Sequence, residues 1–146
     1  MWKIFMEKTV ISENRLVPIP SEMPLREAAL MGCAIPTGAG ILINNTKVKV
    51  GDTVAVFGVG GIGLSVVMVA SIIGAKKIIA IDIEEKKLEL SKQIGATHTI
   101  NSSKHDPLVK IRDITLNNGV DVAIEAAGKR VTMEKAFQSY KFRKRC

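Results

Sequence analysis

The sequence has few cysteines and few aromatic residues, and it has no leader-like N-terminus. Cys33 and Cys146 are far apart, so a disulfide framework is not indicated. Aromatic residues make up 4% of the chain, so no interleaved set of rings is available for stacking nucleic-acid bases. The first residues lack the cationic segment followed by an apolar one that is typical of a signal peptide. We therefore expect a cytoplasmic protein.

Acidic residues are outnumbered by basic ones, which give a formal net charge of +7. An excess of this size is often found in proteins with polyanionic partners. Here more than half of it comes from the C-terminal end, from Lys141, Arg143, Lys144 and Arg145. The remaining basic residues are scattered among acids, as on an ordinary solvated surface. We do not expect nucleic acid to be a partner.

A glycine motif lies between a predicted strand and a predicted helix. Residues 54–57 are an apolar, β-prone run without polar alternation, the pattern of a parallel strand buried on both faces. Gly58, Gly60 and Gly63 follow in the spacing G-x-G-x-x-G. In that arrangement one glycine allows a tight turn, one lets backbone approach phosphates, and one lets the helix lie close to the strand. The motif predicts a binding site for a pyrophosphate at a helix N-terminus.

Asp82 strengthens this interpretation. It closes the next predicted strand, residues 76–81, at about the 20-residue distance expected of an acid that hydrogen-bonds a ribose 2′-hydroxyl. The combination predicts a dinucleotide as the ligand. The alternative is a glycine turn that serves only the packing of strand and helix, without a ligand.

A membrane span is the other interpretation of this region. Residues 53–75 contain no charged side chain, as in a transmembrane helix. The four glycines within residues 58–63 argue against one continuous helix, and the β-branched residues before them favour a strand. We expect no membrane span.

The rest of the chain alternates between helical and strand patterns. Residues 1–20 resemble the end of a small β structure that lacks its partners. Leu90 and Ile94 are expected to face inward from a helix over residues 84–94, and Asp106 and Pro107 to begin another helix that Gly119 stops. The full series of further predicted elements is a helix over 21–31, a helical segment to about 44, strands over 97–100 and 120–127, and a helix over 132–138. This order predicts an α/β fold with a parallel sheet.

Four segments carry a family resemblance: AALMGCAIPTGAG (28–40), VKVGDTVAVFGVGGIGLSVVM (48–68), IIAIDIEEKKLELSKQIGATHTIN (78–101) and NNGVDVAIEAAG (117–128). The chain resembles the cofactor domain of zinc-containing alcohol dehydrogenases, in the medium-chain dehydrogenase/reductase superfamily. The resemblance implies a Rossmann-type, doubly wound parallel sheet, truncated to strands one to four in the order 3-2-1-4. It also implies a division into residues 1–34, a remnant or linker of a GroES-like catalytic domain, and residues 35–146, an NAD(P)-binding domain incomplete at its C-terminus. Strand four would then be an exposed apolar edge through which the chain could self-associate.

The resemblance implies roles for individual residues in dinucleotide binding. Thr37 matches a residue beside the nicotinamide, and Asp82 matches the acid on the adenosine ribose, with Lys87 as a basic residue nearby. The pyrophosphate turn corresponds to Gly58, Gly60, Gly61, Ile62 and Gly63, with Ile62 touching the nicotinamide ring. The acid favours NAD, because a 2′-phosphate would face a carboxylate. Lys86 and Lys87 leave some use of NADP open.

The resemblance also implies a metal. Cys33 matches the third protein ligand of a catalytic zinc, whose other two ligands would lie in a domain preceding Met1. His98 and His105 are expected to be surface or packing residues. The implied function is an NAD-dependent, zinc-type alcohol dehydrogenase, present as a cofactor-domain fragment that acts on an alcohol or aldehyde only when completed. The alternatives are a noncatalytic dinucleotide-binding module and an inactive truncated product.

Overall fold

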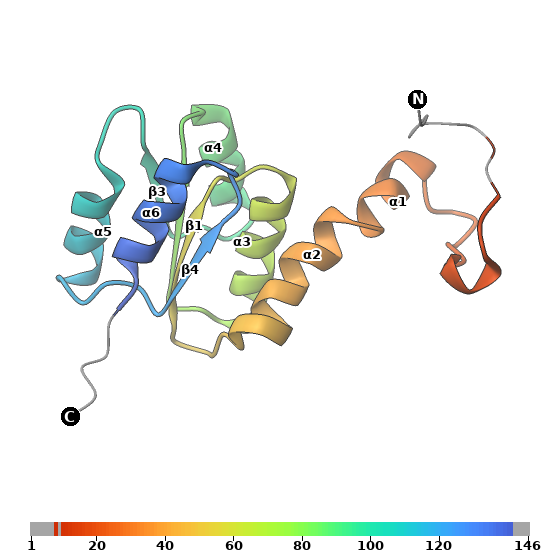
Figure 1. Cartoon of the computed structure of the whole chain (residues 1–146), viewed down its shortest axis with the longest axis horizontal. Coiled ribbons are helices and arrows are strands. Elements are labelled where there is room, and N and C mark those ends of the chain that lie inside the picture. Colours follow the sequence, from red (N-terminus) through yellow and green to blue (C-terminus); the bar gives the residue numbers. More distant parts are fainter. Residues whose placement is uncertain (1–7, 9, 142–146) are drawn as a thin grey trace.

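The computed structural model describes residue 8 and residues 10–141 of the chain (Figure 1). Four parallel strands form its sheet: β1 (Thr53–Phe57), β2 (Lys77–Asp82), β3 (His98–Asn101) and β4 (Val122–Glu125). Their order is β3-β2-β1-β4. The predicted parallel sheet and its strand order are confirmed.

Helices cover both faces of the sheet. α3 (Gly61–Ile73) and α4 (Glu85–Gln93) pack on one face, and α5 (Pro107–Thr115) and α6 (Arg130–Ser139) pack on the other (Figure 1). Alternate residues of β1 supply the two cores because successive side chains of a strand point to opposite faces. Val54 and Val56 contribute to the α3 and α4 side, whereas Ala55 and Phe57 contribute to the α5 and α6 side. The doubly wound α/β fold is thus confirmed.

One prediction for α4 was wrong. Leu90 is 44% exposed, and the buried leucine of this helix is Leu88. Two positions along an α-helix correspond to a rotation of about 200°, so Leu88 and Leu90 lie on opposite faces. Ile94, just after the helix, packs against the core as predicted.

The ends of α3 and α5 follow their sequence patterns in most respects. Gly74 caps α3 in the left-handed conformation, and the Asp106 carboxylate accepts a hydrogen bond from the Leu108 N–H at the start of α5. The predicted stop of α5 at Gly119 was several residues late. Leu116 and Asn117 already have positive φ values, 52° and 61°, so the helix ends at Thr115.

The N-terminal part is helical. A short 3-10 turn (Glu13–Arg15) precedes α1 (Leu25–Met31) and α2 (Ala34–Gly40), which continues as a π-helical segment, η2 (Ile41–Thr46). The described residues before α1, residue 8 and residues 10–24, form no strand, so the predicted β structure is wrong for this part of the chain. Residues 1–7 and 9 of that prediction lie outside the described part. The last five residues of the basic tail lie outside it as well. α2 packs along α3, whereas α1 extends away from the body (Figure 1).

Residues 53–75, which have the composition of a membrane span, form β1 and α3 instead. A different stretch, Leu25–Thr46, is long and apolar enough by length and composition to cross a membrane. Helices of water-soluble proteins meet the same two criteria. In this stretch Gly38 is buried against α3, where an added Cβ would lie 2.6 Å from the Ser65 Cβ.

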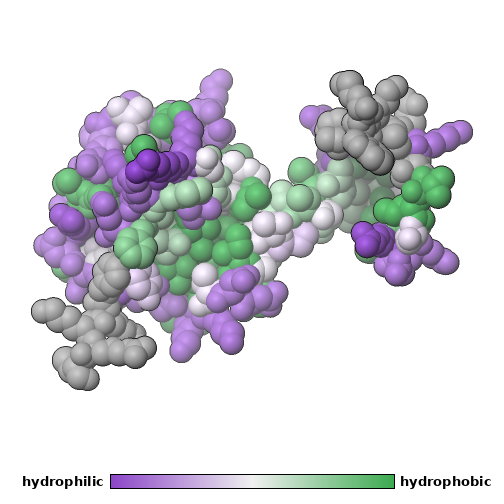
Figure 2. Space-filling model, viewed as in Figure 1, coloured by the Kyte–Doolittle hydropathy of each residue, from purple (hydrophilic) through white to green (hydrophobic). Residues whose placement is uncertain are grey.

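β4 occupies an edge of the sheet, as predicted. Ile124 is buried and Val122 is half-buried, and both side chains belong to the core on the α3 side. Apolar surface is visible between α6 and α2, where β4 lies (Figure 2). Tyr140 forms an isolated parallel bridge with Val120, just before this strand. Self-association through this edge stays a prediction.

Candidate functional site

The glycine turn connects β1 to α3, and packing requires two of its glycines. Gly58 is buried with φ 89°, and an added Cβ would lie 2.7 Å from the Ala127 N. An added Cβ on Gly63 would lie 2.0 Å from the Gly58 carbonyl oxygen. Side chains are therefore excluded at both positions by the protein itself. Gly58 allows the turn, and Gly63 lets α3 approach it.

Gly60 differs from these two. Its φ of −75° is open to any residue, and an added Cβ would meet no protein atom within 4 Å. It is the N-cap of α3, whose first N–H groups have no acceptors within the helix. Packing does not explain the glycine here. Open space beside unpaired N–H groups and the positive end of a helix dipole suits the close approach of a phosphate.

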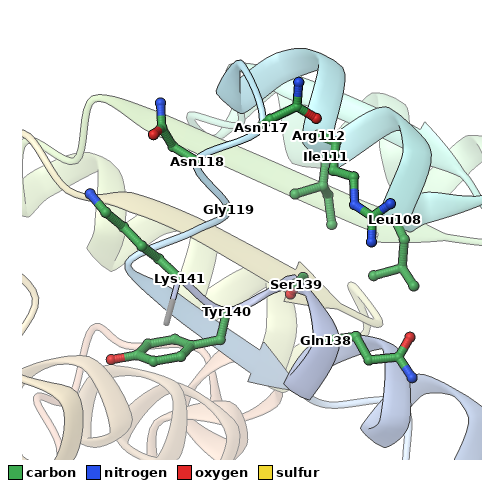
Figure 3. Close-up of a pocket in the computed structure, with 10 residues that line it drawn as sticks. All are labelled: Leu108, Ile111, Arg112, Asn117, Asn118, Gly119, Gln138, Ser139, Tyr140 and Lys141. Carbon is green, nitrogen blue, oxygen red and sulfur yellow. The ribbon is translucent and has the colours of Figure 1, made fainter. Parts of the chain in front are cut away.

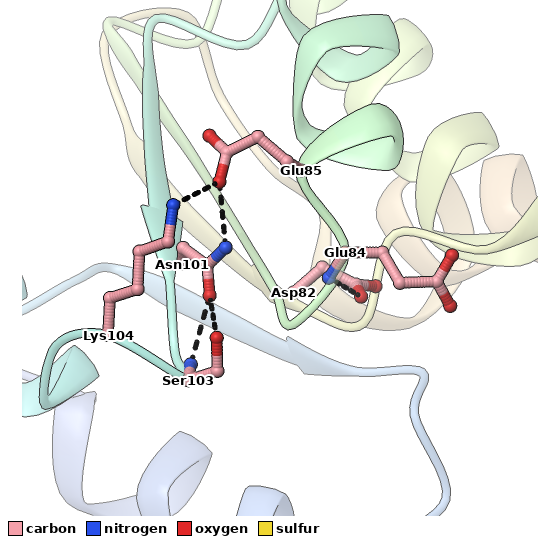
Figure 4. Close-up of polar contacts among 6 residues, drawn as sticks. All are labelled: Asp82, Glu84, Glu85, Asn101, Ser103 and Lys104. Carbon is pink, nitrogen blue, oxygen red and sulfur yellow. Dashed lines mark hydrogen bonds and ion pairs between the residues drawn. The ribbon is translucent and has the colours of Figure 1, made fainter.

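Asp82 ends β2 and contacts the glycine turn directly. Its Oδ2 accepts a hydrogen bond of 2.9 Å from the Val59 N–H. Its Oδ1 accepts two more, of 2.7 Å from the Ile83 N–H and, as Figure 4 shows, of 3.1 Å from the Glu84 N–H. The side chain is half-buried. Each carboxylate oxygen has more than one acceptor position, so hydroxyl groups of a ligand could still donate to it.

A pocket of about 300 Å³ brings part of the predicted site together. Four of the predicted residues line it, namely Gly58, Gly60, Asp82 and Lys87. Gly61, Ile62 and Gly63 form the first turn of α3 beside it. The pocket lies at the carboxyl end of the parallel strands, next to the point between β1 and β4 where the chain order reverses. This is the position at which doubly wound folds bind ligands.

Lys87 is held by an ion pair at the rim of this pocket. Its Nζ lies 2.7 Å from Glu84 Oε1, and the hydrogen bond to Glu84 raises the pKa of Lys87. Both side chains are more than a third exposed, so the pair adds little to stability. Its consequence is electrostatic, because Glu84 offsets the positive charge that Lys87 would present to a ligand.

A polar cluster supports the neighbouring loop after β3 (Figure 4). Asn101 donates from Nδ2 to Glu85 Oε2 at 2.8 Å, and its Oδ1 accepts hydrogen bonds from the N–H and the hydroxyl of Ser103. Lys104 Nζ lies 3.1 Å from the same Glu85 oxygen. The hydrogen bonds from Asn101 and then Lys104 lower the pKa of Glu85. This cluster ties the start of α4 to the loop that carries Ser102 into the pocket.

Cys33 and Thr37 lie outside the pocket. Both are exposed residues at the start of α2, Cys33 being its N-cap, and the Thr37 N–H donates to the Cys33 carbonyl. This end of α2 lies near the glycine turn, because an added Cβ on Gly61 would be 3.6 Å from the Ala34 Cβ. Within residues 8 and 10–141, no three Cys, His, Asp or Glu side chains come together as metal ligands. The described residues therefore do not fit a catalytic zinc, which requires three protein ligands.

Sequence reasoning missed the far wall of the pocket. Ala126, Ala127, Lys129 and Thr132, from the turn after β4 and the start of α6, line it together with Ser102. The predicted strand order could have identified them. It places the carboxyl end of β4 beside that of β1, so the residues that follow β4 must lie next to the glycine turn.

A second hollow, of about 210 Å³, lies between α5 and the end of α6 (Figure 3). Its lining includes Arg112, Asn117, Gly119 and Lys141. None of the predicted site residues is among those that line it. It does not take part in the site described above.

The family model for zinc-binding dehydrogenases matches residues 61–146, more than half of the chain. Among solved structures, an alcohol dehydrogenase zinc-binding domain protein from Burkholderia ambifaria is 43% identical, with a TM-score of 0.78 over 84% of this chain and 33% of that one. Benzyl alcohol dehydrogenase from Acinetobacter calcoaceticus is 39% identical, with a TM-score of 0.80 over 86% and 34%. An alcohol dehydrogenase from Thermus sp. ATN1 is 34% identical, with a TM-score of 0.76 over 84% and 36%. The chain spans about a third of each of these structures.

Proposed function

This chain belongs to the zinc-binding dehydrogenase family, and on that basis we propose that it binds a nicotinamide dinucleotide at its glycine turn and prefers NAD to NADP. The observation that carries the proposal is the meeting of Gly60 and Asp82 in one pocket. Gly60 leaves space for phosphates at the start of α3, and the Asp82 carboxylate lies at the end of the neighbouring strand. A dinucleotide requires both features, one for its pyrophosphate and one for a ribose.

The preference for NAD follows from charge. Asp82 and Glu84 both line the pocket, and Lys87 is paired with Glu84. A 2′-phosphate would bring about two negative charges close to these carboxylates, whereas a ribose hydroxyl can donate a hydrogen bond to Asp82. NADP should therefore bind more weakly than NAD.

We propose alcohol oxidation only for an assembly in which Cys33 is joined by further zinc ligands. A zinc ion would supply Lewis-acid chemistry and the nicotinamide would carry the hydride. The described residues supply one candidate ligand and a nearby dinucleotide pocket. For these residues by themselves, binding of a dinucleotide without catalysis is the function that the geometry supports best.

Calorimetric titration of the purified chain with NAD, and separately with NADP, tests the proposal. We expect saturable binding of NAD and weaker binding of NADP. Asp82→Ala should weaken NAD binding, whereas Asp113→Ala, which removes an exposed carboxylate from α5, should not. If a chain that circular dichroism shows to be folded gives no binding heat with NAD, the proposal is wrong and the glycine motif serves packing alone.

A further inference from the structure

A basic surface lies at the end of the sheet opposite the dinucleotide pocket. Three hollows that share Lys141 open there, around the residues that precede β1, β2 and β4. The acidic residues that line them are Asp52 and Asp121, whereas the basic residues are Lys47, Lys49, Lys76, Lys77, Arg112 and Lys141. Such an excess of one charge raises the local concentration of ligands of the opposite charge. None of these residues lines the dinucleotide pocket.

Two of these cations, from different elements, meet at the hollow of about 210 Å³ between α5 and the end of α6 (Figure 3). Arg112 lies in the last turn of α5, and Lys141 follows α6. The side-chain amides of Asn117 and Gln138 line the same hollow and can donate further hydrogen bonds. Guanidinium and ammonium groups form strong, charge-assisted hydrogen bonds with phosphate and carboxylate oxygens. The hollow therefore has the donor set of an anion site.

The helix ends do not account for these cations. A helix C-terminus has a partial negative charge and often has basic side chains beside it. Carbonyls near the end of α5 are already paired with other donors, which are the Asn117 N–H, the Thr115 hydroxyl and Lys77 Nζ. Neither Arg112 nor Lys141 is required to cap this helix.

Acidic side chains do not neutralise these two cations either. Among residues 8 and 10–141, no carboxylate forms an ion pair with Arg112. Arg112 lowers the pKa of Asp106, but the Leu108 N–H and Lys135 lower it more. The Asp121 carboxylate lies 4.0 Å from Lys141 Nζ, which is the outer limit of an ion pair. Both positive charges are therefore open to a ligand.

We propose that this hollow binds a small oxyanion of the phosphate type, held by Arg112, with Lys141, Asn117 and Gln138 around it. The site lies at the amino ends of the strands, whereas the dinucleotide pocket lies at their carboxyl ends. Binding here is independent of the dinucleotide binding proposed above. The two sites can be tested separately in the same chain.

NMR titration of the isotope-labelled full-length chain with inorganic phosphate locates the site. We expect saturable shifts of the Asn117, Gly119 and Lys141 amide signals, and no such shifts with chloride at the same ionic strength. Arg112→Gln should weaken this binding at least about fivefold, since one charge interaction at short range is worth about 1 kcal/mol. Arg112→Lys keeps the charge but not the fork of donors, so its affinity should lie between the two. Glycerol 3-phosphate as a second probe distinguishes a phosphate ester, if it binds more tightly, from the free ion.

Arg130→Gln is the matched control, because it removes an exposed arginine from α6 that pairs with Glu134 outside the hollow. It should leave the phosphate affinity within about twofold of wild type, a change of less than about 0.5 kcal/mol. An equal loss in Arg130→Gln and Arg112→Gln would overturn the proposal, because it would assign the effect to net charge. Unchanged affinity in Arg112→Gln would overturn it as well. Phosphate shifts confined to the glycine turn would overturn it while supporting the function proposed above.

Discussion

The carboxylate of Asp82 accepts a 2.9 Å hydrogen bond from the backbone N–H of Val59, a residue inside the glycine turn. The two residues come from consecutive β-α connections and join them into one unit. Asp82 thus has a structural role before any ligand is considered. A substitution at this position should change the stability of the chain as well as its affinity for a dinucleotide.

Asp82→Ala tests that structural role. The substitution removes a part-buried hydrogen bond from the Val59 N–H. We expect the free energy of unfolding to fall by about 1–3 kcal/mol, measured by urea denaturation. Asp113→Ala should change it by less than about 0.5 kcal/mol. Equal stabilities of Asp82→Ala and wild type would show that the hydrogen bond to Val59 does not contribute.

Gly61 and Gly63 form a matched pair for the packing of α3. A Cβ at Gly63 would overlap the Gly58 carbonyl, whereas a Cβ at Gly61 would make an ordinary 3.6 Å contact with Ala34. Gly63→Ala should therefore lower the free energy of unfolding by at least about 1–3 kcal/mol. Gly61→Ala should leave it unchanged or raise it by up to about 1 kcal/mol, because alanine favours helix. Thermal or urea unfolding of both variants would check this, and equal effects would contradict the geometry.

Glu84→Gln tests the electrostatic basis of cofactor preference. The substitution removes a carboxylate from the pocket and releases Lys87 from its ion pair. We expect affinity for NADP to rise about fivefold at low salt, since one charge interaction at short range in water is worth about 1 kcal/mol. Affinity for NAD should change little. Glu89→Gln, on an exposed part of α4, is the control, and an equal rise for NADP in that variant would point to net charge rather than to Glu84.

The pH dependence of stability should include a contribution from Asp106. The hydrogen bond from the Leu108 N–H, and then the contact with Lys135, lower the pKa of Asp106. A lowered pKa means that the ionised carboxylate stabilises the fold above the ordinary pKa of about 4. This contribution is lost as the pH falls through the folded-state pKa, which is lower still.

Asp106→Asn isolates this effect, because asparagine also serves as an N-cap but does not titrate in this range. We expect the urea midpoint of the wild-type chain to fall more steeply than that of the variant between pH 5 and pH 2. Parallel pH profiles would show that Asp106 does not contribute to acid sensitivity.

Sequence reasoning predicted the centre of this fold well because the relevant patterns are local. The apolar run before Gly58, the capping residues Asp106 and Pro107, and the helix stop at Gly74 are each determined by neighbouring residues. The side of α4 that faces the core was assigned wrongly because Leu88 and Leu90 are both apolar. Only tertiary packing decides which of the two is buried.

The sequence predicted the residues on only one side of the candidate pocket. The glycine turn and Asp82 belong to a compact motif, whereas the opposite wall comes from residues after β4, more than 40 positions later. Glu125 illustrates the difference. Its carboxylate accepts three hydrogen bonds, from the Ala127 N–H, the Gly128 N–H and the Thr132 hydroxyl. They depend on how the turn after β4 folds back on itself, and no spacing in the sequence indicates them.

Gly60→Ala gives the most direct test of the central claim, which is that the glycine turn is shaped for a phosphate and not only for packing. An added Cβ meets no protein atom within 4 Å, so the free energy of unfolding should stay within about 0.5 kcal/mol of wild type. The same Cβ would occupy the space through which the pyrophosphate approaches the backbone. We expect calorimetric titration to show that NAD affinity falls at least about tenfold in a variant as stable as wild type, a loss of about 1.4 kcal/mol. An unchanged affinity for NAD in that folded variant would contradict the account.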